Sequence, residues 1–451
     1  MNELKQRRER FVFCFSPFGT CVLGLCLCLT LKLDASLFAE SPPWSKFQNG
    51  GQHEVRNQMP TEWSPDSNIA WTVDIPGYGQ SSPIVSGDQV VVTSTSGEKK
   101  DEYHVISYAL KGGGKNWQVD VKNPSPFANT PMVSRAAPSA IAIHNSFIAF
   151  FEGGLLVGIS ANGEKQWERD LVKDYGSIEA RHGLAASLES DGTRVFVWVE
   201  RSQDPYVLAI DPKSGQTLWK AEGVGSTSWG SPRLVPVDDG AHLVCSAIGK
   251  IVGIDPLSGE RLWEFDGIAN NSSNTPTPVG PGEFLIGASE GRGQSSGGNA
   301  AASNGLIQLV RQDNGDWKAS FKWQAKKATS SFGSPVVAGG TAAIVNRAGV
   351  LYRLDLETGE QISVDRTQAG GVWATPIVVN EQIYLFGYKG TTSVISLKDG
   401  KSIAENRCWS EATEEGETPA FGGGRVLYAA AVAGGQWLIR SGDKLYAIRN
   451  Q

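Results

Sequence analysis

The chain is poor in the residues that build metal, disulfide and nucleic-acid sites. After residue 39 only two cysteines remain, Cys245 and Cys408, which excludes a disulfide framework and predicts two separate buried thiols. None of the five histidines stands at a metal-ligand spacing from another. The net charge is −6, and Lys and Arg cluster only within the first ten residues. We therefore expect neither a metal site nor a nucleic-acid partner.

Long helices and common catalytic motifs are also missing. No segment keeps a 3.6-residue apolar period, so long helices are not expected. The sequence contains no Gly-x-Ser-x-Gly elbow and no phosphate-binding loop. It does contain 53 Gly, 14 Trp and 17 Phe, a composition that indicates many turns around a large apolar core.

The first 39 residues have the pattern of a secretory signal peptide. A basic head with Lys5 and Arg10 precedes the uncharged segment 11–31, and a polar stretch then leads to the small residue Ala39. We expect removal of residues 1–39 and a periplasmic or secreted protein. The alternative is an uncleaved membrane anchor at 11–31, which is just long enough to span a bilayer. A lipoprotein is less favoured, because Thr and Leu precede Cys21 and Cys26.

The remainder of the chain is a tandem repeat. Segments 211–219 and 255–263 share the pattern Asp-Pro-x-Ser-Gly-x-x-Leu-Trp, and 355–363 repeats much of it without the Trp. The turn glycine recurs every 41–56 residues, and a Ser/Thr-Pro or Ala-Pro pair that opens an apolar run recurs in phase with it. With a degenerate copy near residue 185 there are eight units, and the pairs start at Ser82, Ala137, Ser231, Thr277, Ser334, Thr375 and Thr418.

Each unit is expected to form four short strands. In the fourth unit, β-branched and aromatic residues fill 231–237, 242–247, 251–255 and 261–265, and Gly, Pro, Asn or Asp bound these runs. Repeats of this length predict an all-β fold, an eight-bladed β-propeller of four-stranded antiparallel blades. The Trp that follows each turn would pack between adjacent blades, at Trp71, Trp117, Trp167, Trp219 and Trp263.

The two ends of the repeat array complement each other. The last unit stops at a third strand, 444–449, whereas 67–74 has the pattern of an outer strand without a sheet. We therefore expect the N-terminal strand to complete the last blade and close the ring. The predicted organisation is a signal peptide at 1–39, an N-terminal extension at 40–62 and the propeller at 63–451.

The motif Asp-x-x-Ser/Thr-Gly-x-x-x-Trp, with its Ser/Thr-Pro pairs, resembles the pyrroloquinoline-quinone (PQQ) repeat family of β-propellers. The resemblance covers about residues 44–451, and it implies that the motif Trp docks one blade on the next. Segments 44–50, 59–63 and 68–71 (Trp-Ser-Lys-Phe-Gln-Asn-Gly, Met-Pro-Thr-Glu-Trp and Asn-Ile-Ala-Trp) are similar to exported bacterial members of unassigned role. The family also includes quinoprotein alcohol dehydrogenases and an outer-membrane assembly lipoprotein, so the repeat predicts a fold and not a function.

Quinoprotein chemistry would need more than the repeat. Such an enzyme holds calcium beside PQQ with oxygen ligands and uses a carboxylate base. The resemblance implies, for the dehydrogenases, an adjacent cysteine pair over the cofactor and extra segments around it. This chain is shorter, and after residue 39 it has no Cys-Cys pair. We therefore expect no catalytic residue, no cofactor and no enzymatic activity, with PQQ and calcium as the alternative.

One mouth of the propeller is the candidate binding site. The loops that precede the innermost strands gather there, and converging aromatic and Arg side chains suit a ligand or a peptide. For each residue, packing between blade tips is the alternative role. The candidates are Tyr78, Arg135, Arg181, His182, Trp229, Asn271, Phe332, Trp373 and Glu417.

Together these patterns favour an exported, non-catalytic propeller that acts as a binding or scaffold module of the cell envelope. We expect a monomer with a protein or peptide partner, and membrane contact only if 11–31 stays uncleaved. The alternatives are a PQQ- and calcium-dependent oxidoreductase and an outer-membrane protein assembly factor.

The signal-peptide hypothesis predicts the N-terminus of the mature protein. Cleavage after Ala39 leaves a chain that begins Glu40-Ser-Pro-Pro. N-terminal sequencing of the protein purified from the cell envelope measures this directly. A chain that still begins at Met1 would instead identify 11–31 as an anchor.

Overall fold

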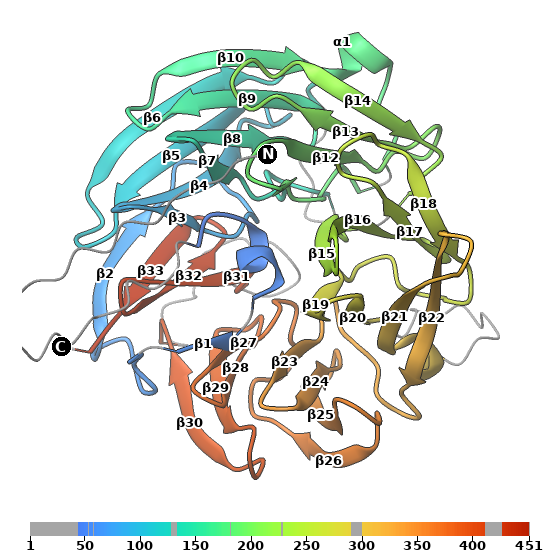
Figure 1. The fold of residues 1–451 in the computed structure, drawn as a ribbon. Coiled ribbons are helices and arrows are strands. Elements are labelled where there is room, and N and C mark those ends of the chain that lie inside the picture. The colour runs from blue at the N-terminus through green and yellow to red at the C-terminus, as the bar shows by residue number, and fades with distance from the viewer. Residues whose placement is uncertain are drawn as a thin grey trace, which may run out of the picture. The chain divides into compact units, whose positions relative to one another are not determined.

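Runs of β-branched and aromatic residues, bounded by Gly, Asp and Asn, form short antiparallel strands throughout the chain. In the computed structural model these strands assemble into eight sheets around a central axis (Figure 1). The structure describes residues 44–52, 54–56, 58–127, 133–180, 182–226, 229–289, 300–410 and 426–450. The predicted eight-bladed propeller is confirmed.

The first four blades each contain four strands, which follow one another from the axis outward. Blade 1 contains β3 (Ile84–Ser86), β4 (Gln89–Ser96), β5 (Glu102–Ala109) and β6 (Lys115–Lys122). Blade 2 contains β7 (Ile141–Ile143), β8 (Ser146–Phe150), β9 (Leu155–Ser160) and β10 (Lys165–Asp170). Blade 3 contains β11 (Glu189–Ser190), β12 (Val195–Val199), β13 (Tyr206–Ile210) and β14 (Thr217–Glu222). Blade 4 contains β15 (Arg233–Val237), β16 (Gly240–Ala247), β17 (Lys250–Ile254) and β18 (Arg261–Phe265).

The last four blades complete the ring. Blade 5 contains β19 (Thr277–Gly280), β20 (Glu283–Ile286), β21 (Gly305–Arg311) and β22 (Trp317–Gln324). Blade 6 contains β23 (Val336–Ala338), β24 (Thr341–Val345), β25 (Val350–Asp355) and β26 (Gln361–Arg366). Blade 7 contains β27 (Ile377–Val379), β28 (Gln382–Phe386), β29 (Thr391–Ser396) and β30 (Ser402–Arg407), with β1 (Glu54–Val55) on its inner edge. Blade 8 contains β31 (Ala429–Ala433), β32 (Gln436–Ser441), β33 (Lys444–Ile448) and β2 (Ile69–Asp74).

Among the residues that the structure describes, helical structure is confined to short turns. These are η1 (Phe47–Gly51), α1 (Leu171–Tyr175) and η2 (Ala300–Ser303). Within the described ranges, no helix has the length and apolar character needed to cross a bilayer.

The ring closes as the sequence predicts. Strand β2 pairs antiparallel with β33, with Trp71 opposite Ala447 and Asp74 opposite Lys444. The outer strand of the last blade therefore comes from the start of the repeat array. This pairing covers an edge that each end would otherwise expose to solvent.

Tryptophan side chains lie between neighbouring blades at the outer strands. The Nε1–H of Trp219 in blade 3 donates to the Pro256 carbonyl of blade 4 at 3.1 Å. Its ring lies on Gly259, where an added Cβ would come within 2.7 Å of the indole. The turn glycine is thus required both for its positive φ of 80° and for this close approach. Trp71, Trp117 and Trp167 donate in the same way to the Leu110, Ala161 and Pro212 carbonyls.

Two tryptophans differ from these four, one in its hydrogen bond and one in its sequence context. Trp263 donates to His242 of its own blade at 3.0 Å, and its ring faces Phe284 of blade 5. Trp323 falls outside the sequence motif, yet its ring also lies between two blades, here blades 5 and 6. It donates to the Leu356 carbonyl at 2.7 Å and covers Gly359.

Hydroxyl groups connect the innermost strands around the axis. The backbone N–H of Ser82 donates to Ser139 Oγ, and the bonds continue to Ser187, Ser231, Thr275, Ser334 and Thr375 at 2.9–3.0 Å. We call these seven residues the hydroxyl belt. In blades 2 and 5 the belt residues are Ser139 and Thr275, each two positions from the predicted Ala137 and Thr277. A hydroxyl side chain therefore marks the belt position in each of these blades, and a proline need not follow it.

The apolar core is divided among the interfaces between blades. Ile148 and Phe150 of blade 2, for example, share one buried cluster with Val197 and Leu208 of blade 3. Cys245 and Cys408 are separate buried free thiols, as the sequence predicts. Since each blade packs mainly on its two neighbours, stability depends on the interblade contacts.

The interblade role of Trp219 predicts the cost of its removal. Trp219→Ala should destabilise the protein by about 3 kcal/mol, because the half-buried ring and its hydrogen bond are both lost. The matched control is Leu218→Ala on the same strand, whose side chain is 52% exposed. Urea unfolding measures both variants. If the two lose equal stability, Trp219 does not dock the blades.

Candidate functional site

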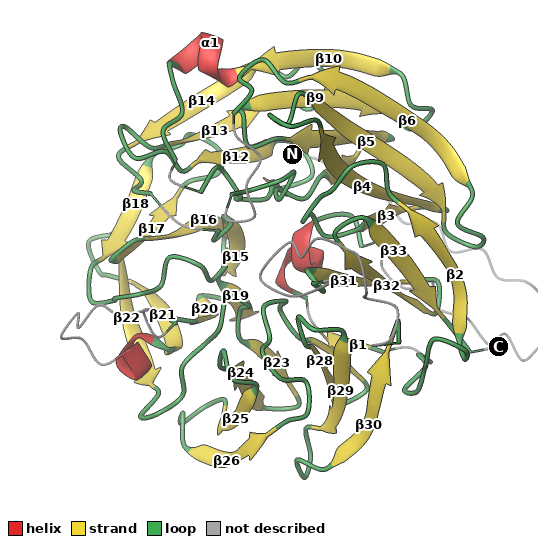
Figure 2. Ribbon diagram, turned by 180° about the vertical axis from the view of Figure 1, so that it is seen from behind, coloured by secondary structure: helices red, strands yellow, loops and turns green. Residues whose placement is uncertain are grey.

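The chain segment that precedes the propeller runs along its axis. We call residues 44–55 the axial segment, and Figure 2 shows its turn η1 at the centre of the ring. The Trp44 and Ser45 carbonyls accept hydrogen bonds from Val85 of blade 1 and Ala142 of blade 2, both at 2.8 Å. Strand β1 then pairs in parallel with β27 of blade 7. This segment lies within the N-terminal extension, for which the sequence predicted no contacts.

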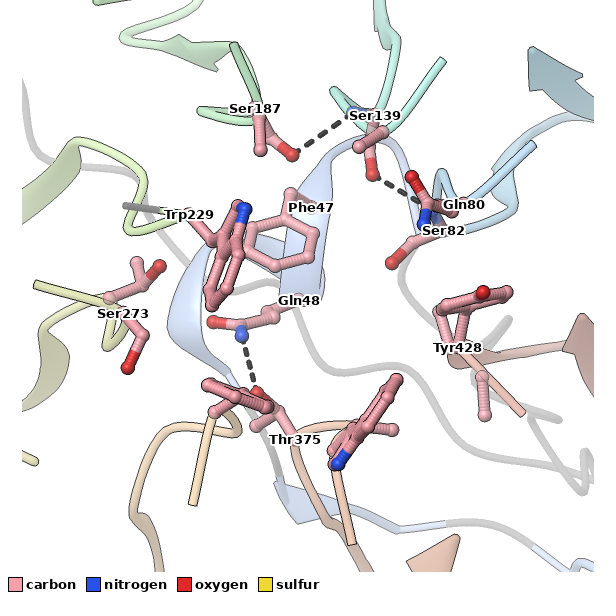
Figure 3. Close-up of a pocket in the computed structure, with 18 of the residues that line it drawn as sticks. Phe47, Gln48, Gln80, Ser82, Ser139, Ser187, Trp229, Ser273, Thr375 and Tyr428 are labelled. Carbon is pink, nitrogen blue, oxygen red and sulfur yellow. Dashed lines mark hydrogen bonds between the residues drawn. The ribbon is translucent and has the colours of Figure 1, made fainter. Parts of the chain in front are cut away.

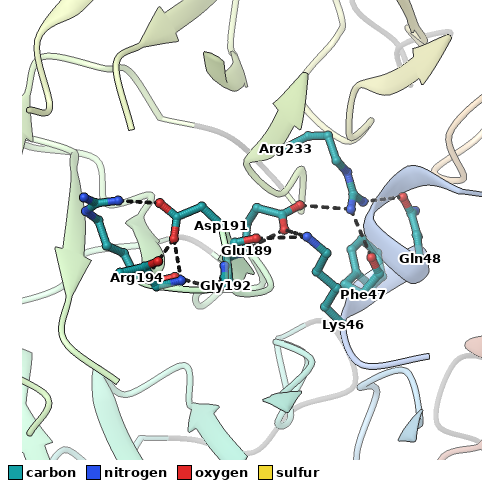
Figure 4. A network of polar contacts seen from close by, with 10 residues as sticks. Lys46, Phe47, Gln48, Glu189, Asp191, Gly192, Arg194 and Arg233 are labelled. Carbon is teal, nitrogen blue, oxygen red and sulfur yellow. Dashed lines mark hydrogen bonds and ion pairs between the residues drawn. The ribbon is translucent and has the colours of Figure 1, made fainter. Parts of the chain in front are cut away.

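A buried ionic network fixes the axial segment to blades 3 and 4 (Figure 4). Glu189 forms ion pairs with Lys46 and with Arg233, the second at 3.1 Å. Arg233 also donates to the Phe47 carbonyl and to Gln48 Oε1, at 3.1 and 3.0 Å. Glu189 and Arg233 are each 1% exposed. Removing one partner would leave a buried charge uncompensated, so the network specifies where this segment sits.

The axial segment makes a left-handed turn at its centre. Gln48, Asn49, Gly50 and Gly51 have φ values of 52°, 48°, 67° and 88°. Left-handed backbone is unfavourable for the two non-glycine residues. Gln48 compensates through its side chain, which donates to Thr375 Oγ1 at 2.6 Å and accepts from Arg233. The turn thus forms a fixed platform across the axis.

A cavity of about 440 Å³ lies on this platform. Figure 3 shows Phe47 and Gln48 of η1 within a ring of side chains from several blades. Trp44, Phe47 and Gln48 line the cavity, together with belt residues that include Ser82, Ser139, Ser187, Thr275 and Thr375. Its volume suits a small organic ligand or part of a peptide.

Aromatic side chains from four blades form a continuous arc at the mouth. Trp229 contacts His182 and Phe332, with ring centroids 5.7 and 5.0 Å apart, and the Trp229 and Phe332 rings meet edge to face. Phe332 contacts Trp373, which stacks on Tyr388 at 5.0 Å. We call these five residues the aromatic arc. Loops that are far apart in sequence therefore present one apolar surface beside the cavity.

Trp229 is held in an unusual conformation. Its φ is +87°, an outlier for a bulky residue, and its side chain is 36% exposed. Strained backbone of this kind persists where the surrounding structure holds it, and it is concentrated at functional sites. Packing of the protein core does not require an exposed indole on a strained backbone. Such an arrangement is instead expected at a binding surface.

A buried carboxyl lies beneath this part of the mouth. Glu200 Oε1 accepts the Ala185 N–H at 2.5 Å. Burial raises the pKa of Glu200 to about 8, although the N–H groups of Ala185, Ala186 and Trp229 favour its ionised form. No ion pair to Glu200 occurs within the described part of the chain. The Trp229 loop therefore rests on a carboxyl that is protonated at neutral pH.

Eight of the nine predicted mouth residues divide into three groups. Trp229, Phe332 and Trp373 line the cavity, and His182 contacts Trp229. The Arg135 guanidinium lies 3.7 Å from the Tyr78 ring centre, and Tyr78 bonds through its hydroxyl to Tyr428 at the cavity wall. Arg181 and Glu417 lie outside the described residues.

Asn271 does not line the cavity. It is buried, and its side-chain amide donates to Ser246 Oγ and to the Ala247 carbonyl. Asn271 therefore stabilises the loop between β16 and β17, and its role is structural.

Three further residues of the mouth were not predicted. Arg347 and Tyr388 lie in loops after the second strands of blades 6 and 7, and Tyr428 precedes β31. The Arg347 guanidinium lies 4.9 Å from the Phe332 ring centre. Arg347 and Tyr388 were missed because the prediction rested on the loops before the innermost strands alone. Tyr428 was missed because the prediction placed the entry to blade 8 at Glu417, whereas the innermost strand β31 begins at Ala429.

The described lining of the cavity does not match the calcium site of a quinoprotein. The described residues around the cavity supply hydroxyl, amide, indole and guanidinium groups but no carboxylate. Calcium beside a quinone needs several oxygen ligands, with carboxylates foremost. This donor set does not fit that ion. We also find no cluster of three potential metal-binding side chains in the described ranges.

The raised pKa of Glu200 predicts a pH-dependent stability difference. The protonated carboxyl stabilises the folded state below pH 4.5, and this contribution is lost as the pH rises through about 8. Glu200→Gln keeps a neutral side chain at every pH. The variant should therefore gain stability over the wild type between pH 5 and 8, by up to about 1.4 kcal/mol per pH unit.

Thermal unfolding from pH 5 to 9 measures this difference. The control is Glu260→Gln at an exposed position of blade 4, which should leave the pH profile unchanged. A difference between wild type and Glu200→Gln that stays constant across this range would contradict the assignment.

Comparisons with known proteins agree with this architecture. Residues 61–198 and 177–363 match the family model described as outer membrane protein assembly factor BamB. BamB of Moranella endobia (strain PCIT) is 25% identical over 256 residues, which are 53% of this chain and 61% of that protein. BamB of Alkalilimnicola ehrlichii is 26% identical over 167 residues, 37% of each chain. The chain thus spans less than two thirds of the length of these relatives.

Solved structures share the fold at low identity. BamB from Moraxella catarrhalis superposes with a TM-score of 0.56 at 14% identity, covering 85% of this chain and 97% of that one. A europium-containing methanol dehydrogenase gives 0.56 at 12% identity, covering 89% and 90%. An assembly factor and an enzyme are thus equally similar in fold, so the fold does not choose between their functions. The sequence match extends over more than half of the chain, which therefore belongs to the PQQ-like repeat family described as outer membrane protein assembly factor BamB.

Proposed function

We propose that this chain is an exported, non-catalytic propeller that binds unfolded polypeptide at the aromatic arc and acts in the assembly of outer-membrane proteins. The signal peptide would be residues 1–39, and the mature protein would consist of the extension 40–62 and the propeller 63–451. Both curated relatives carry the name of an outer-membrane assembly factor. Applying that role to this chain is a proposal, because the match covers only part of each relative.

The aromatic arc is the observation that carries the proposal. Trp, Tyr and Phe dominate the energetics of protein interfaces, since they bury a large apolar area with little loss of conformational entropy. Trp229, Phe332 and Trp373 are only partly buried, and two of their contacts are edge to face. An unfolded outer-membrane polypeptide offers alternating apolar side chains. Such side chains match an apolar surface that has no fixed polar pattern.

A quinoprotein oxidoreductase is the less supported alternative. Its calcium would need carboxylate ligands, and the described lining of the cavity offers none. No step of a redox reaction is assigned to any residue of this chain.

The test is direct binding of an unfolded outer-membrane polypeptide to the purified mature protein. A fluorescently labelled β-barrel protein, kept unfolded in dilute urea, is titrated with wild type and with Trp229→Ala/Trp373→Ala. Loss of two aromatic anchors should weaken binding at least tenfold, or about 1.4 kcal/mol. Fluorescence anisotropy measures the dissociation constant.

The matched control is Leu257→Ala, which removes an apolar side chain that is 65% exposed on an outer turn of blade 4. This variant should bind as the wild type does. Equal affinities for all three proteins would refute the aromatic arc as the binding surface. A wild type that fails to bind any outer-membrane polypeptide would refute the proposed function.

A further inference from the structure

The cavity contains buried polar groups that the protein leaves without partners. Trp44 Nε1, Ser134 Oγ and Ser273 Oγ have no hydrogen-bond partner among the described residues, and all three residues line the cavity. They are only 2%, 4% and 7% exposed. Buried polar groups in folded proteins are almost always paired, so three such groups around one cavity offer a bound molecule a set of hydrogen-bond partners.

The hydroxyl belt adds further donors to the same wall. Ser82, Ser139 and Ser187 line the cavity, and the oxygens of Ser139 and Ser187 each accept a backbone N–H from the preceding blade. A hydroxyl that accepts in this way still has its own hydrogen to donate. No bond donated by Ser139 or Ser187 is found within the described ranges. Their hydroxyl hydrogens are available to a ligand in the cavity.

Amide and carboxylate oxygens that could accept a hydrogen bond from a ligand are, in contrast, scarce along the described wall of the cavity. The amide oxygens of Gln48 and Gln80 already accept from Arg233 and from the Arg135 N–H. The described lining includes no carboxylate side chain. A ligand rich in acceptor oxygens fits.

The remaining lining is apolar. Phe47 and Trp44 lie at the base, and Phe332 and Trp373 lie at the mouth. We infer that the cavity binds a carboxylate joined to an aromatic or similarly sized apolar group, with the carboxylate on the serine hydroxyls and Trp44 Nε1. A carboxylate accepts hydrogen bonds only, so it matches this set of donors without leaving its own groups unpaired.

This inference goes beyond the proposed function, because it assigns a ligand chemistry to the cavity and does not depend on outer-membrane assembly. Two sources carry the same chemistry: a free aromatic acid and the carboxyl end of a polypeptide. The cavity volume of about 440 Å³ holds either group.

The first experiment compares two probes that differ only in the carboxylate. N-acetylphenylalanine and its amide are titrated into the purified mature protein by calorimetry. The acid should bind with a dissociation constant of about 1 mM or below, and the amide at least tenfold more weakly. A peptide that ends in Phe with a free carboxylate separates the two sources. Tighter binding than the free acid identifies a chain end, and exclusion of the peptide identifies a small molecule.

Substitutions of the cavity serines test whether the acid binds in the cavity. Ser134→Ala/Ser273→Ala removes two unpaired hydroxyls and should weaken the binding of N-acetylphenylalanine at least fivefold. Its melting temperature without ligand should not fall, because no protein hydrogen bond is lost. A merely structural role for these serines would lower the melting temperature instead. The matched control, Ser214→Ala in an exposed turn of blade 3, should bind the acid normally.

Three results would overturn the inference. They are equal binding of the acid and its amide, no binding of either, and calcium-dependent binding of PQQ in place of the acid. The serine variants should still bind unfolded outer-membrane polypeptide, because the aromatic arc is intact. Failure of this inference is therefore separable from failure of the proposed function.

Discussion

Six hydrogen bonds, each from a backbone N–H of one blade to the hydroxyl of the next, fix the innermost strands of blades 1 to 7 around the axis. These groups are largely buried, so an unmatched N–H would cost about 1–3 kcal/mol at each step. The belt therefore determines the spacing of the blades near the axis and, with it, the width of the cavity. It also explains why a small hydroxyl residue recurs in blades 1 to 7, where the fold alone would accept any residue compatible with a strand. The predicted Thr418 of blade 8 lies outside the described residues.

The repeat could be predicted from sequence because its signals are local. A turn glycine with a positive φ and a Trp four residues later mark the same position in several blades. The outer strand 67–74 lacks the glycine, and it was recognised by its Trp and by the missing fourth strand of the last unit. The pattern was two residues out of phase at Ala137, where it was guided by a proline whereas the belt uses the hydroxyl of Ser139. In blade 5 two Thr-Pro pairs follow each other, and the belt uses Thr275 and not Thr277. The axial segment could not be predicted. Its partners, such as Val85, Arg233 and Val378, belong to different blades, and its own sequence has no strand or helix period.

The axial segment and the mouth have opposite physical requirements. The segment is held by a buried ionic network and by a left-handed turn that the Gln48 side chain fixes to Thr375 and Arg233, so it forms a rigid base. The mouth exposes Trp229 on strained backbone above a protonated carboxyl, and it presents apolar area that folding alone would bury. Stability is thus concentrated at the base and along the interblade contacts, and the mouth is left to recognition. Such a division is common where a binding surface is carried by loops on a rigid scaffold.

Ring closure by the first outer strand has a kinetic consequence. The hydrogen bond between Trp437 and the Pro60 carbonyl joins residues 377 positions apart, and β2 pairs with β33 over a similar separation. Chain entropy delays such contacts, so a high contact order predicts slow folding in which the last blade must form before the first strand has a partner. Once closed, the array has no loose terminal repeat from which unravelling can begin. A linear solenoid frays from its ends, whereas this propeller must break an interior interface first, which favours a long lifetime of the folded state.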